Sequence, residues 1–170
     1  ISGVDYVCHV ASAVYLTAKD PQREIIDVAV KGTQNVFSSI TQNPSIKAVA
    51  LTSSIAAIVG EARPQHTHTE SDWNSDPNTG PYLKSKTLAE KEAWRIAEAQ
   101  TGEQKFRLVT LNPSVVFGPV YTKVHVRSSP SILHDLFRKK MPGAPHFYFN
   151  AVDVRDVAKA HVEALERDTA

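Results

Sequence analysis

The sequence lacks several features that would each indicate a particular class of protein. Its single cysteine, Cys8, excludes an intramolecular disulfide and is compatible with a reducing compartment. Nineteen basic and eighteen acidic residues leave a net charge of +1 with no basic stripe, which argues against nucleic acid as a partner. The most apolar run, 48–60, is too short to cross a membrane, and the first residues do not have the pattern of a signal peptide. We therefore expect a soluble, cytoplasmic protein that binds neither nucleic acid nor membrane.

Apolar runs alternate with segments of helical spacing along the chain. Strands are predicted at 4–10, 46–51, 106–111 and 147–152, and helices at 21–40, 82–100, 129–139 and 155–167. Residues 61–79 form a loop by composition. In the first helix, we expect the buried face to consist of Ile25, Val28, Ala29, Gly32, Val36 and Ile40. Strands that are apolar throughout and alternate with helices predict a parallel sheet covered on both faces.

The chemically most informative segment is Tyr82-Leu83-Lys84-Ser85-Lys86. Gly80-Pro81 precedes it and Gly102 follows the run of helix formers after it, so Tyr82 and Lys86 are expected on one face of a helix. A second Tyr-x-x-x-Lys pattern, 15–19, is followed by Asp20-Pro21, which disfavours a continuous helix there. From the helix alone, an ordinary amphipathic surface with Lys86 reaching solvent is an equal alternative.

Polar residues follow two of the predicted strands. Ser54 lies just past the strand at 46–51 and Ser114 just past the strand at 106–111, while Tyr82 lies near the start of its helix. In parallel sheets, ligands bind outside the carboxyl ends of the strands. These three residues are therefore expected at the same edge of the sheet, where a phenol and an ammonium group suit the interconversion of a carbonyl and an alcohol.

Six segments together resemble the extended branch of the short-chain dehydrogenase/reductase superfamily, of the NAD-dependent epimerase/dehydratase type. Within that branch they are most similar to the dihydroflavonol-reductase-like carbonyl reductases. The segments, in the family's order, are 5–12, 30–36, 51–54, 82–90, 112–119 and 152–158. The resemblance implies a Rossmann-like doubly wound parallel sheet, here the second half of the nucleotide-binding domain and the start of the substrate lobe. Residues 1–118 would form the sheet-and-helix part, 119–150 a substrate-lobe segment, and 151–170 a returning strand end and helix, within one partial domain, 1–170.

The resemblance also implies roles for individual residues. Ser54 would hydrogen-bond the substrate oxygen, with Ser53 as the rival, and Tyr82 would protonate that oxygen. Lys86 would hold the ribose hydroxyls and lower the pKa of the Tyr82 phenol, which is near 10 when free. Tyr82 and Lys86 are therefore also cofactor-binding residues. Further residues expected beside the cofactor, with ordinary packing as the alternative, are Val10, Ala11, Pro113, Ser114 and Val116.

The resemblance predicts an NADP(H)-dependent reductase of a small aldehyde or ketone, with NAD(H) as the alternative cofactor. Dehydration is improbable because Ser54 is followed by Ile55-Ala56-Ala57 rather than by an acidic pair. A homodimer through the helices at 21–40 and 82–100 follows by analogy alone. A nucleotide-sugar epimerase, or a truncated, non-catalytic Rossmann remnant, are the alternatives.

Residues outside the six segments offer weaker candidates. Aromatic side chains that could line a substrate pocket or lie in the core are Trp73, Tyr121, Phe147, Tyr148 and Phe149. Lys123, His125 and Arg127 read as a solvated charged loop. His66 and His68, with Glu70 and Asp72 nearby, lack a clear ligand spacing, so we expect no metal there.

Only seven glycines occur, and none forms the Gly-x-x-Gly-x-x-Gly loop that holds a dinucleotide pyrophosphate in this superfamily. The chain begins at what the family would call its fourth strand. We therefore interpret it as an internal fragment of a longer reductase. The strand at 4–10 would then lie at an exposed sheet edge, and the fragment by itself would bind cofactor poorly.

Overall fold

A computed structural model of the chain describes residues 3–12, 18–60, 66–102, 105–123, 129–140 and 150–168. The strands among them are β1 (Tyr6–His9), β2 (Ala48–Thr52), β3 (Arg107–Leu111), β4 (Val115–Phe117) and β5 (Ala151–Asp153). The helices are η1, a π-helical segment (Gln22–Ile26), α1 (Asp27–Thr41), η2, a 3-10 turn (Ile55–Ala57), α2 (Pro81–Glu98), α3 (Pro130–Phe137) and α4 (Val154–Glu166).

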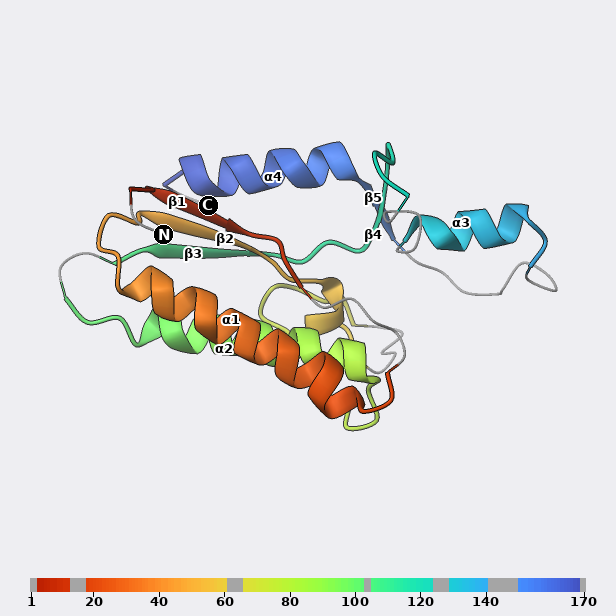
Figure 1. Cartoon of the computed structure of the whole chain (residues 1–170), viewed down its shortest axis with the longest axis horizontal. Coiled ribbons are helices and arrows are strands. Elements are labelled where there is room, and N and C mark those ends of the chain that lie inside the picture. The colour runs from red at the N-terminus through yellow and green to blue at the C-terminus, as the bar shows by residue number, and fades with distance from the viewer. Residues whose placement is uncertain are drawn as a thin grey trace.

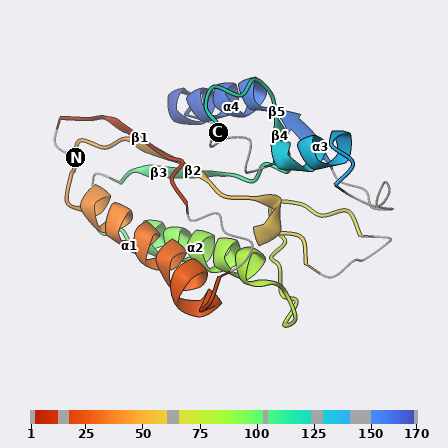
Figure 2. The ribbon, with the colours of Figure 1, turned by 45° about the vertical axis from the view of Figure 1, so that its right-hand side comes forward.

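The strands form two small parallel sheets. β1, β2 and β3 lie side by side in that order, with Cys8 opposite Ala50 and Ala50 opposite Val109. β4 pairs with β5, with Val116 opposite Val152. Helices α1 and α2 cover one face of the three-stranded sheet and α4 covers the other, while α3 projects beyond the β4–β5 pair (Figure 1). Figure 2 shows the same layers from the side and the position of η2 at the end of β2. The predicted parallel sheet with helices on both faces is confirmed.

The core lies between the three-stranded sheet and the α1–α2 layer. Strands β2 and β3 supply one side of it, and α1 and α2 supply the other. Phe37 of α1 is fully buried and meets Phe106 edge-on, with ring centroids 6.0 Å apart. The buried members of this cluster are Phe37, Ile40, Ile46, Val49, Leu51, Ala93, Phe106 and Leu108.

The expected buried face of the first helix is partly wrong. Ile25, Ala29 and Ile40 are buried, but Val28 is 49% exposed. Phe37, absent from the expected face, is the largest side chain that the helix buries, and it packs against Phe106. Val36 is partly buried against the core, and both Val28 and Val36 line a cavity at the strand ends. The helix is therefore rotated about its axis relative to the expectation.

Two further expectations change in detail. No strand is predicted between 111 and 147, but Val115–Phe117 forms β4 because β5 lies beside it and supplies the hydrogen-bonding partner. The strand expected at 147–152 is observed as Ala151–Asp153, and Phe147, Tyr148 and Phe149 lie outside the described residues. The loop expected at 61–79 contains no helix or strand within its described part, 66–79.

Local signals explain how the helices begin. Gly80 precedes α2 in an extended conformation and Pro81 occupies its first position, where the missing N–H is not needed. Asp153 caps α4, since its carboxylate accepts a hydrogen bond from the Arg155 N–H at 2.8 Å. Among the described helices, none is long and apolar enough to cross a membrane.

Candidate active site

Ser54 and Tyr82 meet at the carboxyl edge of the three-stranded sheet. Ser54 follows β2 and caps η2, where its Oγ accepts a hydrogen bond from the Ala56 N–H at 3.2 Å. The Ser54 hydroxyl also reaches the phenol of Tyr82, on the first turn of α2, closely enough to affect its pKa. The two residues that were expected to handle the substrate oxygen are therefore neighbours.

A cavity of about 380 Å³ lies beside this pair. Polar groups come from Ser54, Tyr82, Ser114 and Ser129, and the rest of its lining is mostly apolar. The apolar and small lining residues are Ile55, Ala56, Val59, Gly60, Leu83 and Val115. Such a space, apolar with a few converging hydroxyls, is typical of a small-molecule site.

The environment raises rather than lowers the pKa of Tyr82. Burial of the phenol is the main cause because it disfavours the charged tyrosinate, and the hydrogen bond with Ser54 acts weakly in the opposite direction. Lys86 is not among the causes of this shift, so its expected lowering of the pKa of Tyr82 stays a prediction. The Lys86 Nζ lies 6.0 Å from the Tyr82 ring centroid, and its own charge is disfavoured by burial.

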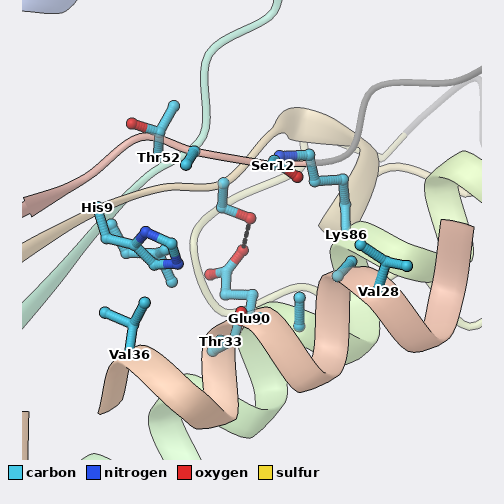
Figure 3. A pocket seen from close by; sticks show the side chains of 14 residues that line it. His9, Ser12, Val28, Thr33, Val36, Thr52, Lys86 and Glu90 are labelled. Atoms are coloured by element: carbon cyan, nitrogen blue, oxygen red, sulfur yellow. Dashed lines mark hydrogen bonds between the residues drawn. The ribbon is translucent and has the colours of Figure 1, made fainter. Parts of the chain in front are cut away.

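Lys86 lies one turn after Tyr82 and is only 7% exposed. Burial lowers the pKa of its ammonium, while the charge of Glu90 opposes that change. Its side chain lines a second cavity, of about 460 Å³, on the other side of the strand end. Figure 3 shows this cavity, with Lys86 and Glu90 from α2 facing His9 and Ser12 near the end of β1.

A buried hydrogen-bond network surrounds Glu90, which is 5% exposed. The Ser53 hydroxyl donates a short hydrogen bond to its carboxylate, marked by the dashed line in Figure 3. The Asn112 side-chain amide donates to the same carboxylate at 2.8 Å and to the Ser54 carbonyl at 3.1 Å. Glu90 therefore ties together helix α2 and the ends of β2 and β3.

Sequence reasoning missed Glu90 and Asn112. Glu90 follows Lys86 by four residues, so both lie on one helix face, and Asn112 comes directly after β3. These positions place both residues near the site but do not predict that Glu90 is buried. The network also distinguishes the two serines, because Ser53 is committed to Glu90 whereas Ser54 faces Tyr82.

The residues expected beside a cofactor lie in three places. Val10 and Ala11 follow β1 and are exposed, and Ala11 lines the cavity that contains Lys86. Pro113 and Ser114 follow β3 and line a further cavity against β5 and α4, and the Ser114 hydroxyl donates to the Asn150 carbonyl at 2.5 Å. Val116 is half-buried within β4.

The other described side-chain candidates do not line the cavity beside the Ser54–Tyr82 pair. Trp73 contacts Lys91, whose ammonium lies 5.1 Å from its ring centroid. Tyr121 is 82% exposed, and Lys123 is exposed as well. His125 and Arg127 lie outside the described residues.

The doubly wound fold, with the Ser54, Tyr82 and Lys86 set at its carboxyl edge, defines the chain as a member of the extended short-chain dehydrogenase/reductase superfamily. A family model described as the 3-beta hydroxysteroid dehydrogenase/isomerase family matches residues 1–167. The chain belongs to this family.

Several characterised proteins are similar to the chain. The cinnamoyl-CoA reductase CAD2 of Medicago truncatula is 39% identical over 181 residues, covering 100% of this chain and 52% of the relative. The NADPH-dependent methylglyoxal reductase GRE2 of Saccharomyces cerevisiae is 33% identical, covering 96% of this chain and 53% of the relative. The crystal structure of yeast methylglyoxal/isovaleraldehyde reductase Gre2 complexed with NADPH matches with a TM-score of 0.87 at 30% identity, covering 98% of this chain and 54% of that chain.

The chain therefore spans about half the length of the relatives that it matches. The likeness extends over nearly all of the present sequence, so the fold and the relative placement of its elements are shared with them.

Proposed function

We propose that this protein is an NADP(H)-dependent reductase of a small aldehyde or ketone. The observation that carries the proposal is the meeting of Ser54, Tyr82 and Lys86 at the carboxyl edge of a doubly wound sheet, beside a mostly apolar cavity. The names of the relatives, which are NADPH-dependent or carbonyl-reducing enzymes, support the same activity. They do not favour the epimerase or the non-catalytic remnant.

The described residues fit a nicotinamide cofactor. Val10 is an apolar residue that is 57% exposed directly after β1, and Ala11 beside it lines the same cavity as the Lys86 ammonium. A buried ammonium next to exposed apolar side chains suits a ligand that has hydroxyl groups and flat rings. Lys86 and Tyr82 would hold the ribose hydroxyls, and the remaining contacts would come from Val10, Ala11, Pro113, Ser114 and Val116. When bound, NADPH supplies the hydride.

The side chains of the site would handle the proton and the charge. Ser54 would donate a hydrogen bond to the carbonyl oxygen of the substrate, and Tyr82 would transfer its phenolic proton to that oxygen as negative charge develops there. Burial raises the pKa of Tyr82, so the phenol holds its proton at neutral pH until charge develops on the substrate oxygen. The Lys86 ammonium would stabilise the tyrosinate that remains.

The cavity limits the class of substrate. Its volume of about 380 Å³ is near the lower end for small-molecule sites, and its apolar lining disfavours highly charged ligands. This supports a small, mostly apolar aldehyde or ketone over a nucleotide sugar.

The proposal also includes a cytoplasmic location and a homodimer. The exposed free thiol of Cys8 is compatible with a reducing compartment, which supports the cytoplasm. A homodimer would use the outward faces of α1 and α2, which are bridged on their surface by a hydrogen bond of 2.9 Å from Gln34 to Glu92.

The test is NADPH oxidation by the full-length protein with methylglyoxal and isovaleraldehyde as substrates. We expect turnover of at least one of them, and we expect Tyr82→Phe to lose about 10²–10⁴-fold in kcat because the phenolic proton is gone. Tyr121→Phe, which changes an exposed phenol, should match the wild type. Equal activity of Tyr82→Phe and wild type would remove Tyr82 from the mechanism, and the proposal with it.

A further inference from the structure

Two histidines and an aspartate come together in the loop between η2 and α2, outside the proposed active site. One ligand atom from each of His66, His68 and Asp72 lies within 4.8 Å of the others. Their spacing in the sequence does not predict this cluster, because the loop has to turn back at 69–72 to bring Asp72 beside the histidines.

The loop itself holds the carboxylate in place. The Thr69 N–H donates to Asp72 Oδ2 at 2.8 Å, and the Asp72 N–H donates to the Thr69 carbonyl at 3.1 Å. The other carboxylate oxygen, Oδ1, lies 2.8 Å from the Nε2 atom of His66. The His68 ring stands edge-on to that of His66, with centroids 4.7 Å apart.

His68 provides a second, independent sign of a ligand. Its Nδ1 atom is buried, and among the residues that the structure describes it has no hydrogen-bond partner. A buried polar atom in this position is unfavourable unless something binds it. An unprotonated imidazole nitrogen is a good ligand for divalent transition metals, and a bound cation would remove the penalty.

We propose that His66, His68 and Asp72 bind a divalent cation of the zinc class. Two imidazole nitrogens and one carboxylate oxygen form a donor set that zinc uses in proteins, with one coordination position left for water. In a tetrahedral site, ligand atoms lie about 3.3 Å apart. The pair formed by His66 and Asp72 is already at 2.8 Å, so binding needs only a modest contraction of the cluster and a slight opening of that pair.

The position of the cluster indicates what the cation would do. Asn74, two residues after Asp72, is buried and anchors the loop to η2: its side-chain amide donates to the Ala56 carbonyl at 3.1 Å and its N–H to the Ala57 carbonyl at 2.8 Å. Gly60 packs against Asn74 so closely that a Cβ there would lie 2.3 Å from the Asn74 Oδ1. A cation on the loop would therefore stiffen the segment that leads into α2 and Tyr82, and we assign it a structural role.

The experiment is a zinc titration of the full-length protein, followed by competition with a chromophoric chelator. A Cys8→Ser background is used throughout, because the exposed thiol of Cys8 is another soft ligand. The test variants are His68→Gln and Asp72→Asn. The matched control is His134→Gln, which disrupts a different surface pair, with His134 Nδ1 3.1 Å from Asp135 Oδ1 and no third ligand beside it in the described chain.

We expect one zinc ion per chain, loss of at least about tenfold in affinity in both test variants, and no change in the control. Saturating zinc should raise the thermal midpoint of the background protein by about 5 °C and leave that of His68→Gln unchanged. Magnesium, which prefers an all-oxygen environment, should not compete. Equal zinc affinity in His68→Gln and the background protein, or an equal loss in the control, would overturn the site. Near-identical circular dichroism of the metal-free variants would show that they are folded.

Discussion

Ser53 and Ser54 follow one another at the end of β2. The residues on the two sides of this strand end differ in the hydrogen-bond partners of their side chains. On the open side, Ser54, Tyr82 and Ser114 line a cavity. On the buried side, Ser53 and Asn112 are both bonded to the carboxylate of Glu90. The polar groups of the open side therefore border a space that a ligand can enter, while those of the buried side hold the strands and the helix together.

Lys86 connects the two sides. It lies over the Tyr82 ring, shares a helix face with Glu90, and lines the cavity at the end of β1. The two adjacent residues Ser53 and Ser54 therefore have different roles, although they belong to one motif. A serine whose hydroxyl is already committed to a buried carboxylate is an unsuitable partner for a substrate, however close it lies in sequence.

Among the variants that distinguish the two sides, we expect Lys86→Met to change kcat/KM the most. The variant should lose about 10²-fold in kcat/KM, because the charge that stabilises tyrosinate and the contact to the cofactor both disappear. Its free energy of unfolding should not fall, since burial lowers the pKa of Lys86 and the fold therefore disfavours the ammonium. Steady-state kinetics and urea unfolding measure both. Lys84→Met, at an exposed position on the same helix, should leave both quantities unchanged, and a similar loss of activity there would contradict the assignment.

Glu90→Gln tests the buried side. Two donors, the Ser53 hydroxyl and the Asn112 amide, would lose a charged acceptor, so we expect the free energy of unfolding to fall by about 2 kcal/mol. Chemical denaturation of the variant beside Glu98→Gln, which alters an exposed carboxylate at the end of α2, gives the comparison. A variant as stable as the wild type would mean that the network contributes little to the fold.

The smallest effect concerns the pH dependence of stability. Because the folded state raises the pKa of Tyr82 above its unfolded value, the stabilisation is fully present below pH 10 and is lost as the pH rises through the raised pKa. Wild type should therefore lose more stability than Tyr82→Phe between pH 9 and pH 11.5. Both proteins contain Lys86, so the difference between their unfolding curves isolates the phenol. Parallel curves would show that Tyr82 is not buried as described.

The fold could be predicted from the sequence where signals were local and strong. The helix with Tyr82 has Gly80-Pro81 before it and a long run of helix formers, and its observed start at Pro81 agrees with that reading. The apolar strands β2 and β3 were likewise expected within one or two residues of their observed bounds. Three-residue β4 was missed because its pairing depends on β5, which lies over thirty residues later in the chain.

The site could be predicted only in part, because some of its contacts join residues that are far apart in the sequence. Ser54 and Tyr82 could be placed at one sheet edge because one follows a strand and the other begins a helix, and their contact required only that the strand end lie beside the helix start. The burial of Glu90 could not be predicted, because a glutamate on a helix rich in charged residues usually faces water. Its environment is made by Ser53 and Asn112, and these approach it only in the folded chain. The same holds for the raised pKa of Tyr82, which results from burial and not from its neighbours in sequence.

The most direct test of the account compares Ser54→Ala with Ser53→Ala. We expect Ser54→Ala to lower kcat by about 10²-fold, because a donor to the substrate oxygen is removed, and to cost at most about 1 kcal/mol of stability through the lost cap of η2. Ser53→Ala should keep kcat within a few-fold and lose about 1–3 kcal/mol of stability, since the Glu90 carboxylate loses a donor. Kinetics are measured well below both thermal midpoints. If Ser53→Ala loses more kcat than Ser54→Ala, the division into an open catalytic side and a buried structural side is wrong.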